Sequence, residues 1–297
     1  GTAHREMPMT SLRSAPSLLL GLTICAALFL IASGGSQPPA APVAAAQAGA
    51  PGFTMEHWPP GPAAARGRVV YESRCIGCHG DEGRGDGAAS EWLDPLPRDF
   101  QAGNFKFRST PSGELPTETD LMHVVACGLQ GSSMPAFPLM PEGKRRDVVA
   151  YVLYLAKFGL LKTEVDDMLA DGDSLDDVMG ELPALAEEVF YDAFEEVWPV
   201  SSEPSPEVDD DLIDRGKELY EAQCVACHGV SGRGDGPSSF SLRDWKDARV
   251  VPRDFTTGVF RAGSTPKDLY LRLRTGITGT PMPATPGTDE EIWALVH

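Results

Sequence analysis

Cysteine is scarce in this sequence outside two short motifs. Of the six cysteines, four belong to two copies of the pattern Cys-x-x-Cys-His, while Cys25 and Cys127 stand alone. So few remaining thiols exclude a fold held together by a framework of disulfides. We expect Cys25 to act as a plain hydrophobic residue and Cys127 to be a buried free thiol.

Basic residues are also few. The 25 Lys and Arg residues stand against 43 Asp and Glu, which gives a formal net charge of -18. Residues 163–214 hold 19 of these acids and no Lys or Arg, so the rest of the chain sums to +1. Nucleic-acid binding needs a basic face, and this charge distribution argues strongly against it.

Long hydrophobic runs are missing apart from one near the N-terminus. Arg5 and Arg13 precede an apolar run over residues 18–32, and a segment rich in Ala and Pro follows it. This layout is typical of a secretory signal, and the run is shorter than the roughly 20 residues that a spanning helix prefers. We expect residues 1–50 to be a signal peptide or N-terminal anchor plus linker. Cleavage is favoured, with membrane anchoring through residues 18–32 as the alternative.

The two Cys-x-x-Cys-His motifs carry the clearest chemical signal. Two thiols three residues apart can each form a thioether to one porphyrin, and the next histidine can bind its iron, so the motif predicts c-type haem. A thioredoxin-like pair would not need the histidine, and a zinc ribbon would need two pairs much closer together. We therefore expect two covalently bound haem c groups, held by Cys75, Cys78 and His79 and by Cys224, Cys227 and His228.

The similarity between the two halves extends well beyond the motifs. A repeat of this length predicts two copies of one domain, as does a length of 297 residues. We place the first domain at 51–162, an acidic connector at 163–211 and the second domain at 212–297. The matching residues are Gly67 and Gly216, Tyr71 and Tyr220, Gly83–Gly87 and Gly232–Gly236, Pro97–Phe100 and Pro252–Phe255, Ser109–Pro111 and Ser264–Pro266, and Met134–Pro135 and Met282–Pro283.

The repeat also indicates the second iron ligand. A methionine thioether is a usual partner of histidine in cytochromes c, and Met282 is the one methionine after His228. Met134 lies 56 positions after Cys78, Met282 lies 55 after Cys227, and both precede proline. We expect the iron ligands to be His79 with Met134 and His228 with Met282. The rivals in the first domain are Met122 and Met140, which we interpret as core residues, and His123, whose counterpart is Leu271.

On these motifs the chain resembles the class I c-type cytochromes, and its CxxCHG and GxGDG stretches look like the cytochrome c domains of bacterial respiratory complexes. The resemblance implies an all-α fold of two tandem cytochrome c domains joined by an acidic helical connector. It also implies that the first and last helices of each domain cross, with Gly67 and Tyr71 on the first helix and Tyr151 and Tyr154 on the last. Residues 290–297 begin the matching last helix, so we expect the second domain to be C-terminally truncated by about one turn.

Both copies place a PRDF motif and an aromatic-basic stretch between the haem motif and the methionine. Arg98 and Arg253 are candidates to bind the haem propionates, because Arg forms bidentate hydrogen bonds to carboxylates. The alternative is a salt bridge inside the loop, such as one from Arg98 to Asp99. We expect apolar walls for the haem pockets from Phe100, Phe105, Phe255 and Phe260.

Apolar residues of the connector recur at helical spacing among the acids. They predict an amphipathic helix that covers an apolar patch between the two domains, or else docks another subunit. Residues 201–206 read as a short spacer. The apolar positions are Leu182, Leu185, Val189, Phe190, Phe194, Val197 and Trp198.

These observations predict a di-haem cytochrome that carries single electrons in the periplasm or on the outer face of the cytoplasmic membrane. Its partners would be redox proteins or a membrane respiratory complex of which it is a subunit. The protein would not itself be an enzyme, since both irons are closed by two ligands. The alternative is a di-haem enzyme or sensor, peroxidase-like, with one open iron; the matching ligand sets in the two copies argue against it.

Overall fold

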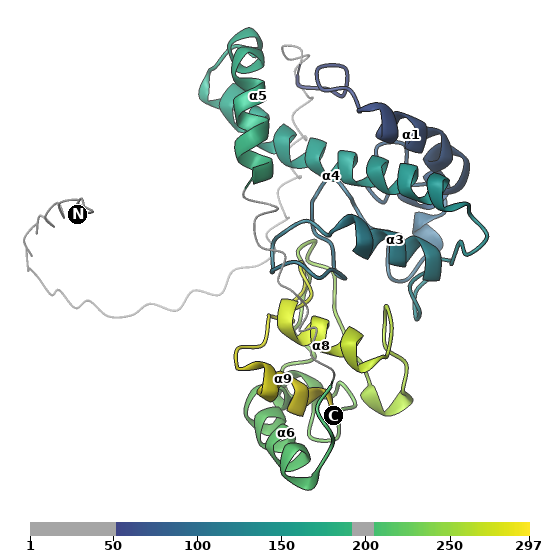
Figure 1. Ribbon diagram of the computed structural model, residues 1–297. Coiled ribbons are helices and arrows are strands. Elements are labelled where there is room, and N and C mark those ends of the chain that lie inside the picture. The colour runs from purple at the N-terminus through teal and green to yellow at the C-terminus, as the bar shows by residue number, and fades with distance from the viewer. Residues whose placement is uncertain (1–51, 192–204) are drawn as a thin grey trace, which may run out of the picture. The chain divides into compact units, whose positions relative to one another are not determined.

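The computed structural model describes residues 52–191 and 205–297, and this part of the chain is helical, with no strand beyond one isolated β-bridge between Arg243 and Arg249. Two groups of helices follow one another in the same order (Figure 1). The first group is α1 (Pro62–Arg74), α2 (Ile76–His79), η1 (Ser90–Trp92), α3 (Glu118–Cys127) and α4 (Glu142–Asp171). The second is α6 (Asp210–Gln223), α7 (Val225–His228), η2 (Phe255–Thr257), α8 (Pro266–Thr275) and α9 (Asp289–Val296), and α5 (Leu175–Tyr191) lies between the groups in sequence.

The two copies use the same local signals to start α3 and α8. Thr117 caps α3 by accepting a hydrogen bond from the backbone N–H of Asp120, and the Asp120 side chain in turn accepts one from the Thr117 N–H. Thr265 and Asp268 form the same capping box at α8. Thr265 is therefore the equivalent of Thr117, and the match of Ser264–Pro266 with Ser109–Pro111 expected from the sequence is wrong, because residues 109–111 lie outside any helix. Reciprocal caps of this kind satisfy two free backbone donors and fix the helix start. Two tandem all-α domains, as predicted, are therefore built from repeated local sequence.

The first and last helices of each domain cross at a glycine. In the first domain, a Cβ added to Gly67 on α1 would lie 1.8 Å from the backbone oxygen of Asp147 on α4. In the second, a Cβ added to Gly216 on α6 would lie 2.2 Å from the backbone oxygen of Ala294 on α9. Only a residue without a side chain allows the backbones to approach this closely.

The tyrosines predicted at this crossing are present in the first domain, although the two on α4 have different contacts. The rings of Tyr71 and Tyr151 meet edge to face with centroids 5.1 Å apart. Tyr154 instead stacks on Trp58, 5.3 Å between centroids, and donates a hydrogen bond to its backbone oxygen. Tyr154 therefore fastens the segment before α1 onto α4.

Replacing Gly67 with alanine is expected to lower the free energy of unfolding of the first domain by about 3 kcal/mol, because α1 and α4 must move apart. Gly143 is the matched control: it also lies in a helix of this domain, and a Cβ there meets nothing within 4 Å. Gly143→Ala should change stability by no more than about 1 kcal/mol, in the stabilising direction. Urea unfolding followed by circular dichroism checks both, and equal effects of the two substitutions would contradict the close crossing.

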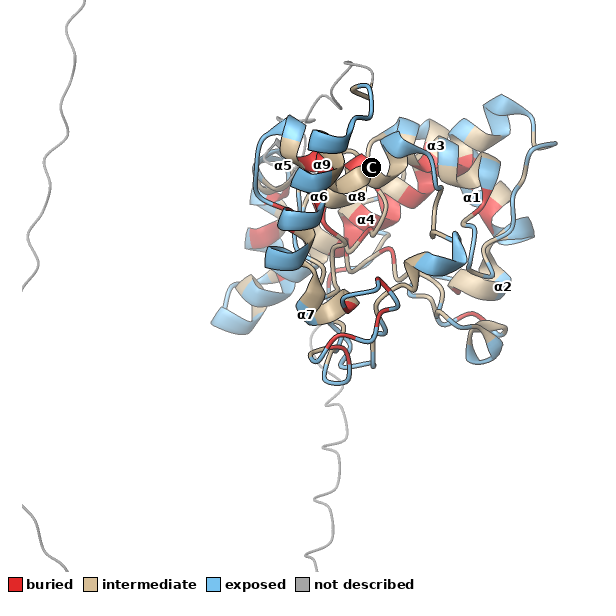
Figure 2. Cartoon of the chain, turned by 90° about the horizontal axis from the view of Figure 1, so that it is seen from below, coloured by how far each residue is buried: buried red, intermediate tan, exposed pale blue. Residues whose placement is uncertain are grey.

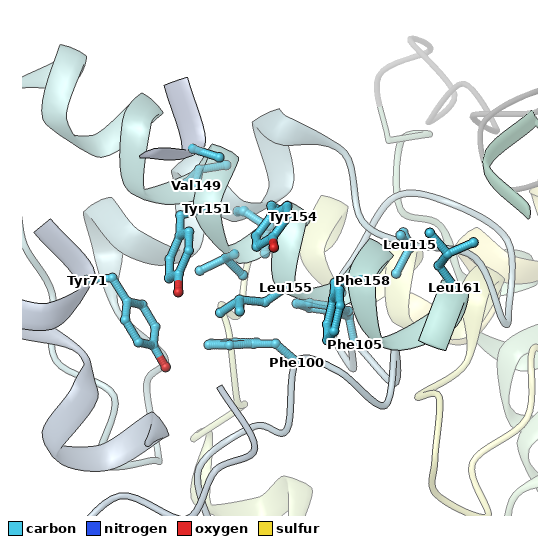
Figure 3. Packing of buried hydrophobic residues seen from close by; sticks show 14 of the residues in the cluster. Tyr71, Phe100, Phe105, Leu115, Val149, Tyr151, Tyr154, Leu155, Phe158 and Leu161 are labelled. Atoms are coloured by element: carbon cyan, nitrogen blue, oxygen red, sulfur yellow. The ribbon is translucent and has the colours of Figure 1, made fainter. Parts of the chain in front are cut away.

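The core of the first domain is organised around α4, whose inward face is buried along its length (Figures 2 and 3). Figure 3 shows Leu155 of α4 next to Phe100, with Tyr71 beside them. Buried hydrophobic residues of the second domain form a smaller cluster of Tyr270, Ile292 and Trp293.

The connector forms a helix, and this helix packs on the first domain. The closing helix α4 runs on to Asp171, so the predicted boundary at 162 falls inside it. After a break at Gly172, α5 buries Val178 and Leu182 in the same cluster as Val165 of α4. The apolar face of α5 thus covers α4. Phe194, Val197 and Trp198, predicted to extend that face, lie outside the described residues, as does the N-terminal run 18–32.

No helix among residues 52–191 and 205–297 combines the length and the apolar character needed to cross a membrane.

Candidate haem-binding sites

Each Cys-x-x-Cys-His motif forms a tight turn at the end of a longer helix. Cys75 ends α1, where its N–H donates to the oxygen of Tyr71, and then begins α2. Cys75, Cys78 and His79 therefore follow one another on a single helical turn, and both thiols are half-buried and free. Cys224 plays the same part between α6 and α7.

The histidine of the first motif is held in one orientation. Its Nδ1 lies 3.0 Å from the backbone oxygen of Arg98. Because a carbonyl oxygen accepts and does not donate, Nδ1 carries the proton and Nε2 keeps a free lone pair. The ring also stacks on Phe100, with centroids 4.5 Å apart. Burial lowers the pKa of His79, and a neutral ring is the form that binds a metal.

The second histidine repeats this arrangement with one difference. His228 stacks on Phe255 with centroids 4.6 Å apart, and burial lowers its pKa. Among the described residues, the buried Nδ1 of His228 has no hydrogen-bond partner of standard geometry. The backbone of Arg253 nevertheless takes the place that Arg98 has beside His79, and it partly offsets the effect of burial on the pKa of His228. The PRDF motifs thus supply both a carbonyl and an aromatic ring beside each histidine.

The glycine-rich loop after each motif donates hydrogen bonds to the free carbonyl oxygens at the end of the turn. In the first domain, Gly85 donates to the oxygen of His79 and Gly87 to that of Cys78. A Cβ on Gly87 would lie 2.5 Å from the oxygen of Ile76, so the loop needs glycine to come this close. Gly234 and Gly236 make the same two bonds to His228 and Cys227.

Both candidate methionines lie in a tight loop after α3 or α8. The oxygen of Met134 accepts from the N–H of Leu129, and its own N–H donates to the Ser132 hydroxyl at 3.2 Å. The oxygen of Met282 accepts from Ile277, and its N–H donates to the Thr280 hydroxyl at 3.3 Å. The repeated bonds hold the two methionines in equivalent backbone positions.

A cavity of the first domain brings the four predicted residues together: Cys75, Cys78, His79 and Met134 all line it. The rivals lie elsewhere: Met122 and Met140 pack against the core, and His123 lines a different cavity. Most of the wall is apolar, including Phe100 and Phe105 as predicted. The other leucine, valine and phenylalanine residues of the wall are Leu93, Leu96, Phe107, Leu121, Val124, Val125, Leu129, Phe137, Val148, Val149 and Val152.

This lining fits a haem. Two thiols stand beside a histidine with a free Nε2, a thioether faces the same space, and apolar side chains surround it. Arg98 also lines the cavity, and among the described residues its side chain makes no ion pair with Asp99, which instead binds Lys246 at 3.3 Å. The arginine is thus available to a haem carboxylate, and that contact stays a prediction.

Two findings differ from expectation. Cys127 is exposed, not buried, and its Sγ lies 3.8 Å from Nδ1 of His123, because this face of α3 turns away from the core. Arg261 of the second domain lines the cavity of the first. No local pattern in the sequence predicts such a long-range contact. The nearest signal is the equivalence of Arg261 and Lys106, each of which follows a phenylalanine, Phe260 or Phe105.

Two tandem helical domains with this turn, this loop and this methionine define the class of c-type cytochromes. The family model described as "Cytochrome C oxidase, cbb3-type, subunit III" matches residues 62–152 and again 211–297. The chain belongs to this family of cytochrome c domains, and such domains imply covalently bound haem c.

A solved structure is also similar to this chain. A chain of the Kuenenia stuttgartiensis reducing HAO-like protein complex is 36% identical to this one, with a TM-score of 0.62. The similarity covers 78% of this chain and 92% of that chain. A search of curated proteins gave no match. The family's cytochrome c domains support a role in electron transfer.

Proposed function

We propose that the chain binds two haem c groups and passes single electrons between redox partners in the cell envelope, as a subunit of an oxidoreductase complex. Cys75 and Cys78 would hold one haem with His79 and Met134 as iron ligands. Cys224 and Cys227 would hold the other with His228 and Met282. The observation that carries the proposal is the convergence of Cys75, Cys78, His79 and Met134 on one apolar cavity.

A bound haem would supply a reversible one-electron couple at its iron. The protein's residues orient the iron ligands and shape the surroundings of the haem. The carbonyl of Arg98 and the ring of Phe100 hold His79 in place. The apolar lining keeps water away, and a thioether ligand together with a dry pocket favours a higher reduction potential. Tyr71 and Tyr220 donate to the oxygens of Gly80 and Gly229, both at 2.7 Å, and thereby fasten each haem motif to the helix before it.

A place in a complex follows from the solved relative, which is a chain of a reducing HAO-like protein complex. Location in the envelope, in the periplasm or on the outer face of the membrane, rests on the sequence of residues 1–50 and on the chemistry of haem attachment. The equal backbone positions of Met134 and Met282 support two closed irons, and so favour a carrier over the peroxidase-like alternative with one open iron.

Carbon monoxide tests this proposal on the natural chain. It binds an open ferrous haem readily and displaces a methionine ligand poorly, so the reduced absorption spectrum should be the same with and without the gas. A spectral change in about half of the haem would instead show one open iron and move the enzyme or sensor alternative to the front.

A further inference from the structure

Four half-buried basic side chains converge near the cavity of the first domain, which the exposed Arg74 also lines. Arg98 and Lys106 come from the first domain, and Arg253 and Arg261 from the second. They form two pairs of equivalent residues. Arg98 and Arg253 hold the same place in the PRDF motif, and Lys106 and Arg261 each follow the phenylalanine five residues after that motif's own phenylalanine. We call these four residues the cation cluster. Arg98, Lys106 and Arg261 line the cavity that Cys75 and Met134 also line.

Reciprocal contacts between the methionine loops and the opposite domain bring the cluster together. A Cβ placed on Gly131, in the first methionine loop, would lie 3.4 Å from Cγ of Arg261 and 3.7 Å from Cγ1 of Val259. A Cβ placed on Gly279, the equivalent glycine, would lie 3.5 Å from Cβ of Asn104, the equivalent of Val259. The two loops therefore contact the same position of the other domain.

Charge in the cluster is uncompensated among the described residues. None of its four side chains makes an ion pair or a side-chain hydrogen bond there, and the buried Nε of Arg261 has no partner. Burial, together with Arg98 and Arg261, lowers the pKa of Lys106 to about 8, and burial and Arg253 lower the pKa of Arg261.

Three acids act on the cluster from a distance. Asp244 acts on Arg98 and Lys106, Asp99 on Arg98 and Asp94 on Arg261. Asp99 binds Lys246, and Asp244 accepts bonds from the backbone of Lys246 and Ala248. Half-buried cations that repel one another need an anion to remain in place. Asp99 and Asp244 already have other partners, and Asp94 is exposed to solvent and makes no ion pair with Arg261 among the described residues.

We propose that Arg261 of the second domain binds a carboxylate of the haem in the first domain, so that the second domain helps to set the first haem's reduction potential. The inference rests on the proposed haem binding. The anion required must reach an apolar cavity already lined by the thiols and the iron ligands, and a haem has two carboxylates on one edge. Arginine suits this contact, because its guanidinium binds a carboxylate through two parallel hydrogen bonds.

The contact has a measurable consequence. Reduction adds one negative charge at the iron, and a nearby cation favours the reduced form. Removing the charge of Arg261 should lower the equilibrium constant for reduction of the first haem about three- to tenfold. That shift is about 30 to 60 mV for one electron.

The experiment compares Arg261→Gln, Arg261→Lys and Arg233→Gln by spectroelectrochemical titration of the full chain. Arg233 is the charge control, since it lies in the second domain, is exposed and does not line the cavity. All variants carry Met282→Ala as well, which lowers the potential of the second haem and leaves the high-potential component to the first. Arg261→Gln should lower that component, whereas Arg261→Lys and Arg233→Gln should leave it within about twofold.

Covalent haem per chain and circular dichroism are measured on every variant. If Arg261→Gln loses haem or helicity, Arg261→Met takes its place, because methionine keeps the aliphatic length. A first-haem potential that moves no more than in Arg233→Gln, or a shift confined to the second haem, overturns the inference. Absence of covalent haem from the natural chain would instead sink the proposed function, and the two failures are thus distinguishable.

Discussion

A chain in which Cys224 and Cys227 are both replaced by alanine is expected to carry half of the natural amount of covalent haem. The two thiols lie on one helical turn with His228, and the structure gives them no disulfide partner within the described residues. Without thioethers, the haem of the second domain is lost on denaturation, while Cys75 and Cys78 keep theirs. A haem stain after denaturing electrophoresis, normalised to protein, measures the ratio.

The matched control is Cys127→Ala. Cys127 is an exposed thiol outside both motifs, so this variant should keep the full amount of haem. An unchanged haem content in the Cys224 and Cys227 double variant would remove the second site from the account, whatever the behaviour of the first.

Replacing Met134 with alanine is expected to open one of the two irons. Carbon monoxide should then change the reduced spectrum of about half of the haem, because His79 remains as the ligand on one side and the thioether on the other is gone. The first domain is the better one to alter, since it contains three methionines that compete for the role and the cavity contains only one of them.

Met122→Ala and Met140→Ala are the controls for Met134. Both side chains pack against the core and do not line the cavity. They are expected to cost stability, as core truncations do, without admitting carbon monoxide. Binding of the gas in Met140→Ala but not in Met134→Ala would mean that the sixth ligand has been assigned to the wrong residue.

Much of the fold could be predicted from the sequence because the determinants are local and occur twice. The glycines Gly67 and Gly216, which the repeat pairs correctly, allow the helices to cross. The repeat paired Thr265 with Thr110, whereas the structure shows that Thr265 caps α8 as Thr117 caps α3. The sequence alone left Met122, Met140 and His123 as rivals of Met134. Their separation depends on which face of each helix meets the cavity, and the structure supplies that information.

Long-range packing was harder to foresee. Hydrophobic spacing predicted a helix in the connector, yet spacing does not identify the surface that Val178 and Leu182 cover, and they pack on α4 of the first domain. Cys127 was expected to be buried on the general tendency of free thiols, but its side of α3 is exposed. The approach of Arg261 to the first domain's cavity joins residues far apart in the chain, beyond the reach of any local pattern.

The amount of covalent haem in the purified natural chain tests the central claim most directly. The alkaline pyridine absorption spectrum, divided by the protein concentration, gives haem groups per chain after all noncovalent contacts are lost. Two per chain is the result that the paired motifs predict. A value of one would contradict the equivalence of the two domains, and a value of zero would contradict the assignment of both motifs.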